Sequence, residues 1–192
     1  MPLLRRGDEI ITGRGPSAQM SSRRWIGAAV LSLLVLTPTA LAGAQKRDVS
    51  IVEGSRLLWA TVNVCDTENS PKTIGIRGSM PGLDDARETM WMRFRVEYLS
   101  EEDHRWHDVT EGGDSGFVPV GSARNKARQG GRSFRINPKN GKPVVLRGRV
   151  SFEWRLRGDV VRRASARTRK GYESSAAADP PGYTAATCTI SP

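Results

Sequence analysis

The chain has little of the material that metal sites and disulfide-rich folds require. Its 192 residues include two histidines and two cysteines. Two cysteines exclude a disulfide-dense miniprotein and a zinc site made of four thiolates, and two histidines leave little for a histidine-rich metal site. Aromatic residues make up 6% of the chain and hydrophobic residues 38%. This composition and length favour one domain with a modest core over two full-sized domains.

A long uncharged run near the N-terminus has the three parts of a secretory signal peptide. Arg23 and Arg24 supply the positive start, and Trp25–Gln45 carries no charged residue. Ala40-Leu41-Ala42 then places small residues at a cleavage position. This order is typical of a segment that is removed on export. We therefore predict a signal peptide over residues 20–42, helical in its apolar part, and a secreted or extracytoplasmic mature protein.

The rest of the chain divides into three parts around this segment. Residues 1–19 form a polar leader without the apolar pattern of a folded element, and Met20 is the start that the signal peptide favours. Residues 43–55 are predicted to be a linker and residues 56–192 a single domain. One alternative stays open: an uncleaved Trp25–Ala44 helix would be just long enough to cross a bilayer and anchor a structural protein.

Strand-like alternation dominates the predicted domain. In Thr89–Ser100 and Val145–Arg157, apolar and charged residues alternate with a period of two, as a half-buried strand requires. Tyr98 falls on the apolar face of the first segment. Shorter alternating segments are separated by turn signals such as Gly130-Gly131 and Pro81-Gly82. These further predicted strands are Arg56–Val64, Lys72–Ile76, Trp106–Val109, Gly116–Val120, Ser133–Ile136, Val160–Thr168 and Ala185–Ile190.

Cys65 and Cys188 are predicted to form one disulfide. Two cysteines in an exported protein most simply pair with each other. The bond would tie the end of the first strand to the last residues of the chain. Closing a loop of that length could stabilise the fold by about 4–5 kcal/mol. Two free thiols or an intermolecular bridge are the alternatives.

The many short strands and turns resemble an immunoglobulin-like or fibronectin-type β-sandwich of exported bacterial proteins. The resemblance covers about residues 50–190 and implies an all-β, antiparallel β-sandwich, with Trp91 as a candidate core tryptophan. It implies no activity, because this architecture hosts many unrelated functions. Cys65 and Cys188 depart from the pattern, since they lie too far apart in sequence for the intersheet bridge of a true immunoglobulin domain.

Positive charge is concentrated in the second half of the domain. Residues 43–120 hold nine basic and fourteen acidic side chains, whereas residues 121–170 hold sixteen basic and two acidic ones. A three-residue Arg157-Gly158-Asp159 loop gives the hairpin register that keeps apolar residues on one face. It also sets Glu153 opposite Arg163, as a cross-strand ion pair.

The same register gathers four arginines on the outward face. It places Arg149 beside Arg167, and Arg147 beside Arg169. Since like charges that face each other are destabilising, something must compensate them. The compensation is either water with acidic side chains from the first half of the domain, or a bound polyanion. We predict a polyanion site at these four arginines.

The expected partner is an anionic envelope polymer or another envelope protein. A nucleic-acid partner is disfavoured, because aromatic residues do not alternate with the arginines. The membrane is a partner only through an uncleaved N-terminal segment. No cofactor is expected, and the predicted function is an exported, non-enzymatic binding module at the cell envelope.

A small secreted hydrolase or metal-dependent enzyme is the alternative from a different class. It would use His104 and His107, which lie among several carboxylates. On a strand, however, these two positions point to opposite faces. Gly113-Asp114-Ser115-Gly116 resembles the nucleophile segment of chymotrypsin-like proteases, but a turn between strands explains the same residues. A hydrolase site requires His104, His107 and Ser115 to meet in one pocket.

Overall fold

The protein was analysed as a computed structural model, which describes residue 52, residues 54–139 and residues 141–192. The predicted leader, the predicted signal peptide and nearly all of the predicted linker lie outside these residues. Within the described part, no helix combines the length and the apolar character needed to cross a membrane.

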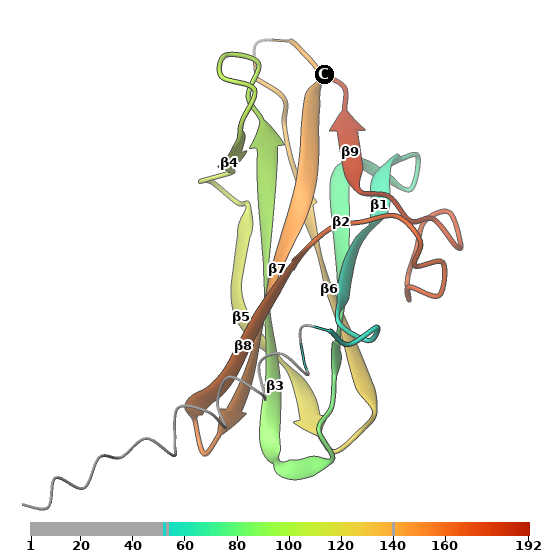
Figure 1. Cartoon of the computed structure of the whole chain (residues 1–192). Helices are drawn as coiled ribbons and strands as arrows, with labels where there is room; N and C mark the ends of the chain where they lie inside the picture. Colours follow the sequence, from blue (N-terminus) through green and yellow to red (C-terminus); the bar gives the residue numbers. More distant parts are fainter. Residues whose placement is uncertain (1–51, 53, 140) are drawn as a thin grey trace, which may run out of the picture. The chain divides into compact units, whose positions relative to one another are not determined.

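The described elements are strands, and they form two antiparallel sheets (Figure 1). The predicted all-β class is therefore confirmed, and the two sheets are compatible with a β-sandwich. Each of the nine predicted segments overlaps one strand, although several bounds differ. The strands are β1 (Trp59–Thr67), β2 (Ser70–Pro81), β3 (Asp85–Leu99), β4 (Trp106–Asp108), β5 (Asp114–Ala123), β6 (Ala127–Arg135), β7 (Val144–Leu156), β8 (Asp159–Arg167) and β9 (Thr187–Ile190).

The first sheet has the order β1-β2-β6, and the second sheet has the order β4-β3-β7-β8. In the second sheet β5 also pairs with β3, and β9 also pairs with β7. After β8 the chain runs towards β1 before it returns as β9 (Figure 1). The Arg169 amide marks this crossing, because it donates to the Ala60 carbonyl oxygen of the first sheet at 2.9 Å. β8 and β9 consequently use the same edge of β7 in succession.

The core lies between the two sheets and takes side chains from both. Ile74 and Ile76 of the first sheet and Phe152 and Trp154 of the second have no exposed surface. Trp154 Nε1 also donates to the Pro81 carbonyl oxygen at 3.0 Å, so the buried indole has its hydrogen-bond partner across the core.

Two aromatic side chains lie elsewhere than the sequence predicts. Trp91 is half-buried on the outer side of the second sheet, where the Arg155 guanidinium lies 4.3 Å from its ring centroid. The core tryptophan is Trp154 instead. Tyr98 was predicted on the apolar face, but it is 37% exposed and its ring lies beside His107. Trp91 lies between the fully buried Met90 and Met92, so alternation itself places it on the outer face. Tyr98 shares the apolar face but lies near the end of β3, where the core ends.

The predicted disulfide is confirmed. Cys65 of β1 and Cys188 of β9 are bonded, with their Cα atoms 5.4 Å apart. Since β1 belongs to the first sheet and β9 to the second, the bond joins the sheets. A disulfide is consistent with a location outside the cytoplasm.

The β7–β8 hairpin has the predicted register in its body and a different turn. Phe152 faces Ala164 and Glu153 faces Arg163, as predicted. The three-residue loop is wrong, however, because Leu156 pairs with Asp159 and leaves a two-residue Arg157-Gly158 turn. Both turn residues have positive φ, 53° and 96°, as a tight hairpin turn of this kind requires. A bulge at Val161 then restores the predicted faces.

Gly130-Gly131 is not a turn. These glycines lie in the middle of β6, which begins at Ala127 and not at Ser133. A Cβ at Gly130 would lie 2.8 Å from Val120 Cγ1 and 3.0 Å from Met92 Sδ. The glycine is therefore needed for close packing against the core, which a composition-based turn signal does not distinguish from chain reversal.

Candidate anion-binding groove

All four arginines of the predicted polyanion site line one surface cavity. Its volume is about 540 Å³, and Arg147, Arg149, Arg167 and Arg169 all contribute to its walls. We call this cavity the arginine groove. It lies where β8 leaves the second sheet, so its lining comes from both sheets.

The chain crossing explains the position of Arg169. The Thr168 amide donates to the Gly148 carbonyl oxygen at 2.9 Å, which is the last contact of this segment with β7. The next amide, that of Arg169, bonds to the first sheet. The predicted pairing of Arg147 with Arg169 is therefore wrong, since Arg147 faces Thr187 of β9. Arg149 does face Arg167, as predicted.

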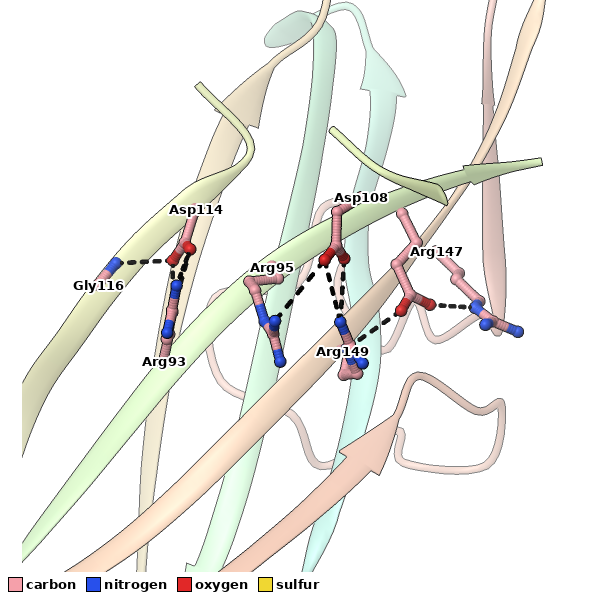
Figure 2. Close-up of polar contacts among 8 residues, drawn as sticks. Arg93, Arg95, Asp108, Asp114, Gly116, Arg147 and Arg149 are labelled. Carbon is pink, nitrogen blue, oxygen red and sulfur yellow. Dashed lines mark hydrogen bonds and ion pairs between the residues drawn. The ribbon is translucent and has the colours of Figure 1, made fainter. Parts of the chain in front are cut away.

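Acidic side chains from the first half of the domain compensate two of the four arginines (Figure 2). Glu97, whose side chain is 6% exposed, accepts from Arg147 Nε at 2.6 Å. Its other oxygen lies 3.1 Å from Arg149 Nε, an ion pair without hydrogen-bond geometry. Arg149 also donates to Asp108 at 3.0 Å, and Arg95 lies 3.7 Å from that carboxylate.

Arg147 is held in a fixed orientation. Its guanidinium lies 4.1 Å from the Trp106 ring centroid, in a cation–π contact. Together with the Nε bond to Glu97, this contact restrains the plane of the guanidinium. Only Nε is used by Glu97, which leaves the terminal nitrogens at the groove. An arginine held in this way loses little conformational entropy when it binds an anion.

Arg167 and Arg169 are exposed, and no ion pair with either is found among the described residues. Lys170, which follows directly, is exposed as well. The groove and the ion pairs beside it contain five guanidinium groups but only two carboxylates, those of Glu97 and Asp108. The five belong to Arg95, Arg147, Arg149, Arg167 and Arg169. The groove carries an excess of positive charge.

Arginines elsewhere on the second sheet are matched by carboxylates. Glu153 pairs with Arg155 at 2.6 Å and with Arg163 at 3.2 Å. On β3, Arg93 donates through Nε to both oxygens of Asp114, at 2.9 and 3.0 Å. This bond lowers the pKa of the Asp114 carboxyl and raises the pKa of the Arg93 guanidinium. These pairs contrast with the groove, where Arg167 and Arg169 have no carboxylate partner among the described residues.

Aromatic and hydroxyl side chains complete the lining. Trp59 stacks on Tyr172 with ring centroids 4.7 Å apart, and both line the groove, as does Trp106. Aromatic residues do not alternate with these arginines in the sequence, but strand topology brings aromatic side chains from other segments to the groove. The exposed hydroxyl residues Ser165 and Thr187 also line it.

The histidines and the serine of the alternative enzyme site do not form a triad. His107 Nε2 lies 2.9 Å from Asp103 on the exposed β3–β4 connection. Ser115 instead accepts from the Phe94 amide at 2.9 Å and donates to the Gly116 carbonyl oxygen at 2.7 Å. His104 has a positive φ of 53° in a turn. Residues 54–139 and 141–192 contain no group of three or more metal-ligating His, Cys, Asp or Glu side chains.

Sequence reasoning missed the groove residues outside β7 and β8. Glu97 lies within the predicted strand Thr89–Ser100, and its position opposite Arg147 follows once β3 is paired with β7. Trp59, Trp106 and Tyr172 carried no such signal, since they come from three other segments. The groove therefore forms only when the strand topology brings these separate segments together.

Comparison of the chain with protein-family models and with curated proteins finds no match. The fold and the groove define the class of protein: an all-β protein with two antiparallel sheets, joined by a disulfide and carrying a basic surface cavity.

Proposed function

We propose that this protein is an exported, non-enzymatic β-sandwich of immunoglobulin-like type that binds an anionic polymer of the cell envelope through the arginine groove. The observation that supports the binding most strongly is the pair of exposed arginines, Arg167 and Arg169, at the rim of a cavity that already holds Arg147 and Arg149. Guanidinium groups suit this role because each donates two parallel hydrogen bonds to a phosphate or carboxylate.

The cost of keeping these arginines together also favours an anionic ligand. Arg149 and Arg167 face each other across β7 and β8. Arg149 is relieved by Asp108 and Glu97, whereas Arg167 faces it without a carboxylate partner in the described part of the chain. An anion in the groove would relieve this remaining repulsion.

Export rests on two features of the chain. The signal-peptide pattern in residues 20–42 predicts it, and the Cys65–Cys188 disulfide is typical of proteins in an oxidising compartment. The immunoglobulin-like type rests on the strand pattern and the two packed antiparallel sheets.

The test is a binding titration of the full chain, purified without reductant, against a teichoic-acid-type polyphosphate and an acidic polysaccharide. The double variant Arg167→Ser/Arg169→Ser should weaken binding at least about tenfold, since two charge-assisted contacts are removed. Its stability should be unchanged or slightly higher, because neither side chain has an ion pair among the described residues and the repulsion between Arg167 and Arg149 is removed. Arg149 is unsuitable for this test, since its replacement would also remove an ion-pair partner of the buried Glu97 carboxylate and so change the stability of the fold.

The matched control is Arg132→Ser/Arg135→Ser on β6, which makes the same change in net charge on exposed residues of the first sheet. The control should bind like the wild type. Equal loss of binding in both double variants would show that only net charge matters, and would refute a site at the groove. Unchanged binding in the groove variant would refute it as well.

A further inference from the structure

The dimensions of the arginine groove suit a small ligand unit. A volume of about 540 Å³ lies within the range typical of small-molecule sites and is far too small for a long stretch of polymer. A surface that binds a polyanion by charge alone needs no cavity. The concavity thus points to recognition of a compact unit, one or a few sugar rings in size.

The distribution of ion pairs on the second sheet also favours a small anionic ligand over an extended one. Beyond the groove, the outward arginines of the second sheet are engaged by carboxylates, such as Arg93 by Asp114 and Arg155 by Glu153. A polyanion lying along the sheet would have to displace these pairs. On this sheet, Arg167 and Arg169 of the groove can be reached without that cost, so the anionic group is expected to bind there while the rest of a polymer extends into solvent.

The remaining lining indicates a hydroxylated body and not a flat aromatic one. Trp59 and Tyr172 already stack on each other, and Trp106 already carries the Arg147 guanidinium on one face. A nucleobase needs a free aromatic face for stacking. By contrast, the exposed Ser165 and Thr187 hydroxyls can exchange hydrogen bonds with sugar hydroxyls.

We infer that the arginine groove binds a single anionic sugar unit, with its phosphate or carboxylate on Arg147, Arg167 and Arg169 and its hydroxyls on Ser165 and Thr187. This inference rests on the proposed function and specifies its ligand. Phosphate and carboxylate share the chemistry that a guanidinium recognises, and the experiment distinguishes them.

The experiment measures binding of glucose 1-phosphate, glucuronate, inorganic phosphate, glucose and AMP to the full chain by calorimetry. One of the two anionic sugars should bind at least about tenfold more tightly than inorganic phosphate and than glucose, because it alone uses both sets of contacts. Ser165→Ala/Thr187→Ala should bring its affinity down to that of phosphate, while leaving phosphate binding unchanged. Affinity for the small anion should fall moderately as salt rises, because salt screens the attraction between its one charged group and the arginines.

The outcomes separate the two proposals. Equal affinity for phosphate and the anionic sugars would overturn the sugar-unit inference but leave the anion groove in place. Tightest binding by AMP would overturn it in favour of a nucleotide. Binding of long polymers alone, with a salt slope of about −5 or steeper, would indicate an extended surface instead. If neither the sugars nor the polymers bind, the proposed function itself fails.

Discussion

Replacing Glu97 by glutamine separates binding from stability at the groove. The Glu97 carboxylate is 6% exposed and lies 2.6 Å from Arg147 Nε and 3.1 Å from Arg149 Nε. Glutamine keeps the size of the side chain and removes its charge. Two arginines then lose the carboxylate they share, and the groove gains one net positive charge.

The two expected effects have opposite signs. Breaking a fully buried ion pair costs about 3–5 kcal/mol and breaking an exposed one about 0–1 kcal/mol. Since the Arg147 and Arg149 side chains are 18% and 28% exposed, we place the loss of unfolding free energy in between, at about 2 kcal/mol. Binding of an anion should become stronger by about fivefold, because one competing negative charge near the ligand contributes about 1 kcal/mol at a screened surface.

Glu153 provides the matched control. It is equally buried on the same sheet and pairs with two arginines, Arg155 and Arg163, away from the groove. Glu153→Gln should lower stability by a similar amount and leave anion affinity unchanged. Urea unfolding followed by tryptophan fluorescence measures the first quantity, and calorimetric titration with the anionic ligand measures the second. If Glu97→Gln weakens binding, Glu97 does not compete with the ligand and the reasoning is refuted.

Two further predictions concern the frame that carries the groove. Cys65→Ser/Cys188→Ser opens a loop with a sequence separation of 123 residues and should lower the unfolding free energy by about 4–5 kcal/mol in the chain-entropy model. Equal urea midpoints for the wild type with and without reductant would contradict this. The pKa of Asp114 is lowered chiefly by its hydrogen bonds with Arg93, so this pair stabilises the fold above the unfolded carboxyl pKa of about 3.9 and loses that effect as pH falls through the lowered folded value. The stability difference between the wild type and Asp114→Asn should therefore shrink below about pH 4 in acid titrations, and a difference that does not depend on pH would argue against the pair.

The strands were predictable because every second side chain of a half-buried strand faces the core and is therefore apolar. Met92, Phe94, Val150 and Phe152 are all fully buried, as the alternation predicts. Strand ends were less predictable where packing needs a small residue. β2 continues five residues beyond the predicted end at Ile76. This extension contains Gly78, where a Cβ would lie 3.2 Å from Val150 Cγ1. The close packing requires a small residue there, and a small residue interrupts the apolar alternation that the prediction used.

The error in the predicted β7–β8 turn did not change the predicted pairing of arginines at the groove. The hairpin loop was predicted one residue too long, but the bulge at Val161 compensates for the shorter turn. The buried face therefore decided the register, and the turn adapted to it. As a result, the pairing of Arg149 with Arg167 followed from sequence even though the turn did not.

The arginine groove lay beyond sequence reasoning because its charge balance depends on which strands become neighbours. The sequence shows an acidic first half and a more strongly basic second half, which predicts partial neutralisation but not where it occurs. Pairing of β3 with β7 places Glu97 opposite Arg147. Because β3 and β8 lie on opposite edges of β7, Arg167 of β8 faces Arg149 and not a carboxylate of β3. The chain then crosses to the first sheet at Arg169, and this crossing also brings Trp59 and Tyr172 to the wall of the cavity.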